Sequence, residues 1–144
     1  MLEPTIDFAL SPLARARICR ALVVAAMGAV AGSAWADQDV MSSDGQWKLH
    51  AKMPDTLAVK KPTEALIDVT PAAGGKGCPN LGSVVFEMPS HGHGGDMAPQ
   101  SMSMDGCKFH VTDLSASMGG SWRLRLVLKS GDKSSNADFT VAAK

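Results

Sequence analysis

The segment W-R-L-R-L-V-L-K, residues 122–129, constrains the fold more than any other part of the chain. Its large apolar side chains, Trp122 and three leucines, recur at every second position, and basic side chains stand at three of the positions between them. A period of two predicts a β-strand with one buried face, because successive side chains of a strand point to opposite sides. No segment carries a 3.6-residue apolar stripe of useful length, so we expect an all-β protein.

Other segments show the same alternation or a β-rich composition, and turn-forming residues separate them. They are residues 47–53, 64–70, 81–88, 107–112 and 137–142, and residues 100–104 pair with 107–112 across a turn. About seven short strands at turn-separated intervals are typical of an immunoglobulin-like β-sandwich. We therefore predict a single immunoglobulin-like antiparallel β-sandwich of about seven strands.

The dipeptide Asp-Gly at 105–106 predicts how two of these strands pair. Asp-Gly between two strands is a strong signal for a tight two-residue hairpin turn. In that register Met104 faces Cys107 and Met102 faces Phe109, and directly paired residues point to the same side of a sheet. Phe109 belongs to an apolar face, so this register places both methionines in the core.

Residues 1–36 have the pattern of a secretory signal peptide. Three arginines precede an apolar run at 21–32, and S-A-W-A follows, with cleavage expected after Ala36. The apolar run is shorter than the roughly 20 residues that a membrane-spanning helix needs. We expect the mature chain, residues 37–144, to be one periplasmic domain; an amino-terminal anchor that is not cleaved is the alternative.

The expected mature chain carries almost no net charge. The sequence has 14 basic and 14 acidic residues. The leader holds three of the basic and two of the acidic ones, which leaves 11 basic and 12 acidic residues in the mature chain. Nucleic acids favour a clustered basic face and anionic lipids attract basic segments, so the composition favours neither partner. The mature residues also contain no clear transmembrane segment, so we expect no membrane insertion.

Cys78 and Cys107 are the two cysteines of the expected mature chain, since Cys19 lies in the leader. Two cysteines in an exported chain of this size favour one disulfide. The alternative is a pair of free thiolates that bind copper or zinc, although neither cysteine belongs to a C-x-x-C pair.

The stretch M-P-S-H-G-H-G-G-D-M, residues 88–97, follows a predicted strand and is rich in glycine. Thioether sulfur suits Cu(I), whereas imidazole binds both copper and zinc. Met88, His91, His93 and Met97 are therefore candidate copper ligands, and the glycines allow the backbone bend that brings the two histidines together. The alternative is an ordinary connection between strands, in which Met88 continues a core face.

The order of these motifs resembles the YtkA-like and FixH-like domains. The matching pieces are M-P-S-H-G-H-G at 88–94, M-G-G-S-W-R-L at 118–124 and F-T-V at 139–141, within a resemblance that covers most of residues 45–142. It implies an exported or membrane-tethered protein with an immunoglobulin-like sandwich, and several relatives are associated with copper handling or cytochrome oxidase assembly. The cysteine pair departs from the family pattern.

Other residues that bind metals in proteins have ordinary roles in this pattern. His50 and His110 alternate outward on their strands and are expected to be solvated, and Met118 is expected to pack. No motif of a serine hydrolase, a zinc protease or a phosphate-binding loop appears, so we do not expect an enzyme.

These patterns predict a small exported protein that binds copper through the 88–97 loop and buffers or delivers it. Its expected partner is an envelope copper protein or an oxidase-assembly protein. The alternative is a metal-free accessory module that contacts an envelope protein or takes part in cytochrome oxidase assembly.

Overall fold

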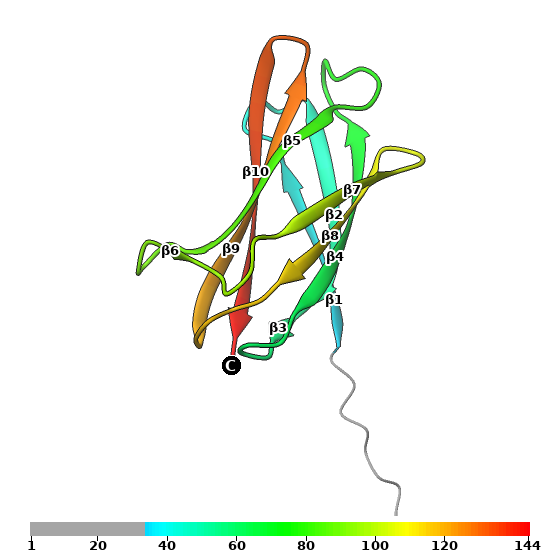
Figure 1. Cartoon of the computed structure of the whole chain (residues 1–144). Helices are drawn as coiled ribbons and strands as arrows, with labels where there is room; N and C mark the ends of the chain where they lie inside the picture. Colours follow the sequence, from blue (N-terminus) through cyan, green and yellow to red (C-terminus); the bar gives the residue numbers. More distant parts are fainter. Residues whose placement is uncertain (1–33) are drawn as a thin grey trace, which may run out of the picture. The chain divides into compact units, whose positions relative to one another are not determined.

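The computed structural model describes residues 34–144, which form two five-stranded β-sheets (Figure 1). Sheet I contains, in spatial order, β1 (Trp35–Met41), β2 (Trp47–Pro54), β4 (Thr63–Pro71), β8 (Lys108–Leu114) and β7 (Gln100–Met104). Sheet II contains β3 (Thr56–Leu57), β10 (Lys133–Ala143), β9 (Gly120–Ser130), β5 (Asn80–Met88) and β6 (His93–Gly94).

The strand order is that of an immunoglobulin-like sandwich. The order β2-β4-β8-β7 reproduces the A-B-E-D sheet of that fold, and β10-β9-β5 reproduces its G-F-C sheet. Seven strands thus take the seven positions that the sequence predicts, and the predicted β-sandwich is confirmed. Three strands are additional: β1 extends sheet I, while β3 and β6 are two-residue strands at the edges of sheet II. The β3–β10 pair is parallel, whereas the prediction was wholly antiparallel.

The core lies between the two sheets and depends on alternation along each strand. In β9 the faces separate as predicted, with Trp122 and the leucines at 124, 126 and 128 at most 1% exposed. The other large buried side chains come from both sheets: Trp47, Leu49, Met53, Ile67, Val69, Phe109, Val111 and Leu114 from sheet I, and Leu57, Phe86, Met88, Phe139 and Val141 from sheet II. One continuous apolar core therefore holds the sandwich together.

The start of β1 overlaps the cleavage site that the sequence predicts. Most of the expected signal peptide, residues 1–33, lies outside the described residues. Trp35 and Ala36 do lie within them, and they pair with Pro54 and Met53 of β2. Cleavage after Ala36 would therefore shorten β1 by these two residues. No helix in residues 34–144 is long and apolar enough to span a membrane.

The register of the β7–β8 hairpin differs from the predicted one. Met104 faces Lys108 and Met102 faces His110, so the connection has three residues and not two. Cys107 takes a left-handed backbone conformation with φ of 58°, which lengthens the turn by one residue. A shift of one residue turns every side chain of a strand to the other face. The prediction that both methionines are buried was wrong, because Met102 is 65% and Met104 is 46% exposed.

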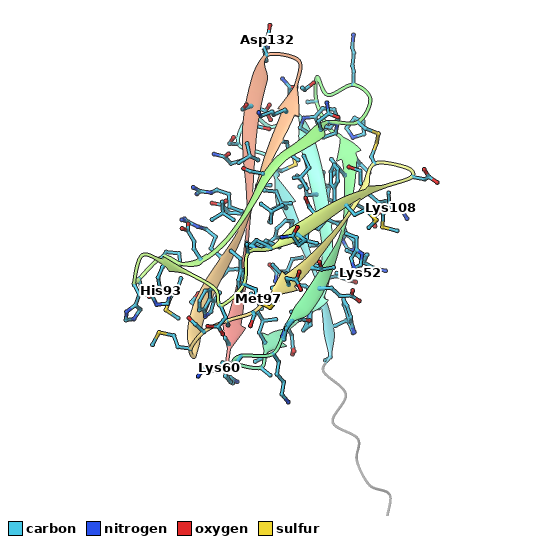
Figure 2. The ribbon with its side chains drawn as sticks, viewed as in Figure 1. Lys52, Lys60, His93, Met97, Lys108 and Asp132 are labelled. Atoms are coloured by element: carbon cyan, nitrogen blue, oxygen red, sulfur yellow. A yellow bond between two sulfur atoms is a disulfide. The ribbon has the colours of Figure 1, made fainter. Side chains whose placement is uncertain are left out.

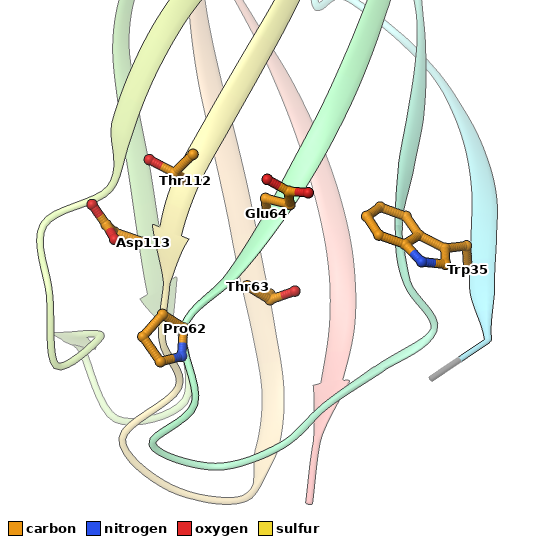
Figure 3. A pocket seen from close by; sticks show the side chains of 6 residues that line it. All are labelled: Trp35, Pro62, Thr63, Glu64, Thr112 and Asp113. Carbon is orange, nitrogen blue, oxygen red and sulfur yellow. The ribbon is translucent and has the colours of Figure 1, made fainter. Parts of the chain in front are cut away.

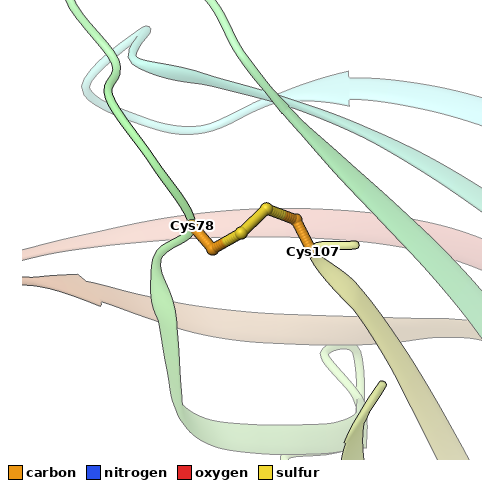
Figure 4. The surroundings of a disulfide bond; sticks show 2 residues. All are labelled: Cys78 and Cys107. Carbon is orange, nitrogen blue, oxygen red and sulfur yellow. A yellow bond between two sulfur atoms is a disulfide. The ribbon is translucent and has the colours of Figure 1, made fainter. Parts of the chain in front are cut away.

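The predicted disulfide joins Cys78 to Cys107 (Figure 4). It connects the segment before β5 of sheet II to the turn before β8 of sheet I, with the two Cα atoms 5.3 Å apart. This separation lies within the usual range for a disulfide. The two cysteines are thus bonded to each other, and in this oxidised form they are not free thiolates that could bind a metal.

Removal of the disulfide is expected to destabilise the fold through the unfolded state. Because the bridge closes a loop with a sequence separation of 29, Cys78→Ser/Cys107→Ser should lower the free energy of unfolding by about 3–4 kcal/mol. Urea denaturation of wild type and the double variant measures the difference. An unchanged denaturation midpoint would show that the crosslink contributes nothing to stability.

The ion pair between Arg125 and Asp138 gives stability a defined pH dependence. Arg125 donates two hydrogen bonds of 2.7 Å to this carboxylate from the directly opposite position on β9. These bonds hold the pKa of Asp138 below its ordinary value of 3.8. Because the pKa of Asp138 is lower in the folded state, the ionised carboxylate stabilises the fold at pH values above its ordinary pKa. This stabilisation is lost as the pH falls through the folded-state pKa.

Asp138→Asn should therefore be less stable than wild type at neutral pH. The two proteins should converge in acid as Asp138 of the wild type becomes protonated. Urea midpoints measured from pH 7 to pH 2 test this, and a gap that stays constant over the whole range would contradict it.

Candidate metal centre

The two histidines of the 88–97 loop lie on a short hairpin between β5 and β6. His91 and Gly92 donate their backbone N–H groups to the carbonyl of Met88, at 3.2 and 2.9 Å. Gly92 has a φ of +66°, which glycine adopts without a steric penalty. The chain then returns as β6, where His93 pairs with Met88. Figure 2 shows His93 at the outer tip of this hairpin.

The two imidazole rings are close enough to bind one ion. Their centroids are 5.8 Å apart, the ring planes are inclined by 45°, and both residues are exposed. Since a metal–nitrogen bond is about 2 Å long and a ring centroid lies about 1 Å beyond the nitrogen, two imidazoles on one ion have centroids about 5–6 Å apart. The hairpin therefore brings His91 and His93 together, as the sequence analysis requires for a shared ion.

His93 is also held against the core. The rings of His93 and Trp122 are in an edge-to-face arrangement with the centroids 5.8 Å apart, and Trp122 stacks on Phe86 at 4.9 Å. Its Nδ1 lies 3.1 Å from the carbonyl of Gly94. When Nδ1 donates its proton to that carbonyl, the lone pair on Nε2 is the one free to bind an ion.

The two methionines of the candidate set lie in different surroundings. Met88 is 2% exposed, and its terminal methyl group packs beside the Cα of Gly120, so its place is in the core. Met97 is exposed and lies on the segment that runs from β6 toward β7 (Figure 2). Next to it, Asp96 donates its backbone N–H to the carbonyl of Ser115 at 3.1 Å. The histidine pair is thus accessible from solvent, whereas Met88 lies beneath the hairpin.

Met118 is an exposed thioether that the sequence analysis assigned to packing. It is 41% exposed, and its backbone carbonyl accepts a 3.0 Å hydrogen bond from the indole N–H of Trp122. Trp122 therefore contacts both His93 and the backbone of Met118. The sequence signal for exposure was the Gly119-Gly120 pair, which marks a loop at the start of β9.

The histidine pair has no carboxylate or thiolate partner in a ligand cluster. Among the residues that the structure describes, no three side chains of histidine, cysteine, aspartate or glutamate are grouped to hold an ion. Further protein ligands at the hairpin would accordingly be thioethers. Met97 and Met118 are exposed thioethers, on the segment after β6 and on the segment before β9.

A hollow of about 390 Å³ lies elsewhere, at the end of sheet I where β1 begins (Figure 3). Its lining residues are Trp35, Pro62, Thr63, Glu64, Thr112 and Asp113. None of these lining residues is a histidine, a cysteine or a methionine, so the hollow offers no imidazole or sulfur ligand for copper.

No family model matches this sequence, and no curated protein matches it. The resemblance to YtkA-like and FixH-like domains stays a prediction.

Gly95 fixes the position of the hairpin by a close backbone approach. A Cβ atom at this residue would lie 2.3 Å from the carbonyl oxygen of Ser115, so Gly95→Ala requires the segment to move. We expect a loss of about 1–3 kcal/mol in the free energy of unfolding, measured by urea denaturation. Gly94→Ala is the matched control, because its Cβ would meet only the carbonyl of Phe86 at 3.6 Å. Equal effects of the two substitutions would rule out the close approach as the cause.

Proposed function

We propose that the protein binds one copper ion at the hairpin that carries His91 and His93, and that it buffers or delivers copper in the periplasm. The observation that carries the proposal is the 5.8 Å separation of the two exposed imidazole rings. This separation lies within the range expected for two imidazoles that bind one ion. The residues of the proposed primary set are His91 and His93. The proposed thioether donors are Met97, four residues after His93, and Met118, whose carbonyl accepts a hydrogen bond from the Trp122 ring that contacts His93.

The chemistry of the available donors favours copper over zinc. Zinc sites in proteins take three or four ligands from cysteine, histidine, aspartate and glutamate. The hairpin offers two such ligands, and the remaining exposed donors are thioethers, which are soft and suit Cu(I). A site with two imidazoles and one or two thioethers therefore discriminates in favour of Cu(I).

The openness of the hairpin supports exchange of the ion with a partner. Both histidines are exposed, and thioethers are weak ligands that an incoming donor can displace. A partner can thus add its own ligand before the ion leaves. This mechanism suits an envelope copper protein or an oxidase-assembly protein as the partner.

The second candidate function is a metal-free accessory module for an envelope protein or for cytochrome oxidase assembly. The observation that favours it is β7, which stands at the edge of sheet I with all five residues exposed. Its sequence, Q-S-M-S-M, contains no charged residue. Edge strands usually carry charges that prevent pairing with another chain, so β7 is suited to accept a strand from a partner.

Titration with Cu(I) separates the two functions. The purified full chain, kept anaerobic with ascorbate, is titrated against a chromophoric Cu(I) chelator. His91→Ala/His93→Ala should weaken binding at the hairpin at least tenfold, because both imidazole ligands are lost. The matched control is His50→Ala, because the strand partners of His50 are Asp39 and Asp68 and neither of them is a thioether donor.

The control variant should bind Cu(I) as the wild type does. Absence of binding by the wild type at micromolar copper would exclude the copper function and favour the accessory module. An unchanged affinity and stoichiometry in the double variant would exclude the histidine hairpin as a site.

A further inference from the structure

The corrected register of the β7–β8 hairpin creates a second group of soft donors on the outer face of sheet I. Met102 and Met104 are two residues apart on β7, so their side chains share one face, and that face is solvated. Met102 stands directly opposite His110 of β8. Side chains at directly opposed positions have Cβ atoms about 4.5–5.5 Å apart, within reach of a common ion.

His110 is oriented as metal-binding histidines commonly are. Its Nε2 lies 2.7 Å from a carboxylate oxygen of Glu64, which lies on the neighbouring strand β4. A carboxylate that accepts the proton of one ring nitrogen fixes the tautomer and increases the basicity of the other nitrogen. Here the arrangement leaves Nδ1 of His110 as the nitrogen available to an ion.

Charges of both signs surround this face, since Lys52 and Lys108 lie beside Met104 and the carboxylates of Asp68 and Glu64 lie on the same sheet. Lys108, which is paired with Met104, is neutralised by Asp68 at 3.4 Å. Glu64 supplies a further negative charge beside His110. Met104 also borders a small hollow of about 190 Å³, which Lys52, Asp68 and Lys108 help to line.

We propose that Met102, Met104 and His110 form a second Cu(I) site, with Glu64 as the residue that positions His110. Two thioethers and one imidazole form a soft ligand set that suits Cu(I). The site also accounts for large apolar side chains on an edge strand, where natural sheets usually place charges. It does not depend on the histidine hairpin, which belongs to the other sheet; Lys108 and His93 lie on opposite sides of the molecule in Figure 2.

The test compares Cu(I) stoichiometry in matched variants of the purified full chain, with ascorbate as reductant and Cu(I) as the only added metal. Met102→Leu/Met104→Leu removes both sulfur atoms and keeps the side-chain volume, so the fold should be retained. Met102→Leu/Met104→Leu should bind one Cu(I) fewer than the wild type, and so should His91→Ala/His93→Ala. Met41→Leu is the matched control, because Met41 is also exposed, at 52%, on the other edge of sheet I.

Each proposal has its own failing result. If Met102→Leu/Met104→Leu binds as much Cu(I) as the wild type with unchanged affinity, the second site is excluded. If His91→Ala/His93→Ala binds as the wild type does, the hairpin site is excluded and the second site is not. Loss of all Cu(I) binding in His91→Ala/His93→Ala would also exclude an independent second site.

Spectroscopy gives a readout that overall stability does not affect. In the His91→Ala/His93→Ala background, Cu(I) should shift the methyl resonances of Met102 and Met104 and leave that of Met41 in place. Glu64→Ala should lower the Cu(I) affinity of this background about tenfold and change the tautomer populations seen in the ring ¹⁵N shifts of His110. Unshifted methyl resonances of Met102 and Met104 would overturn the proposal.

Discussion

The burial of Trp122 is the interaction on which the histidine hairpin and its surroundings depend. Its ring stacks on Phe86 of the neighbouring strand, and both side chains are almost fully inaccessible to solvent. The same ring supports His93 at its edge and donates a hydrogen bond to Met118. A rigid aromatic pair in the core thus fixes one imidazole on the surface, which lowers the entropy cost of assembling a site on a hairpin.

A second constraint comes from Cys107, where a covalent crosslink and a left-handed backbone meet. The disulfide holds this residue near the segment before β5, and its conformation inserts one additional residue into the β7–β8 turn. The inserted residue decides which face the methionines occupy. The exposed group of Met102, Met104 and His110 is therefore a consequence of turn geometry. The two methionines lie on the outer face of sheet I and not in the core.

The sequence predicted the strands well because alternation reports burial directly. Residues 122–129 separate into a buried and an outer face as expected, and the seven main strands were all identified. The β7–β8 register could not be derived, because Asp-Gly suits a two-residue turn and a positive φ at Cys107 leaves no local signal. The closeness of His91 and His93 follows from their spacing. The contact of His93 with Trp122 does not, since it joins residues 29 positions apart that only the packed fold brings together.

The beginning of β1 overlaps the cleavage junction that the sequence predicts. Ala36 forms part of a strand that pairs with β2. A peptidase that cuts after this residue must bind the chain as an extended, unpaired segment. Once the segment is paired in the sheet, the peptidase can no longer bind it. Cleavage and closure of sheet I would then compete for the same stretch of backbone. A chain that folded before it was cut would protect its own junction, so the order of the two events would determine which amino terminus the protein carries.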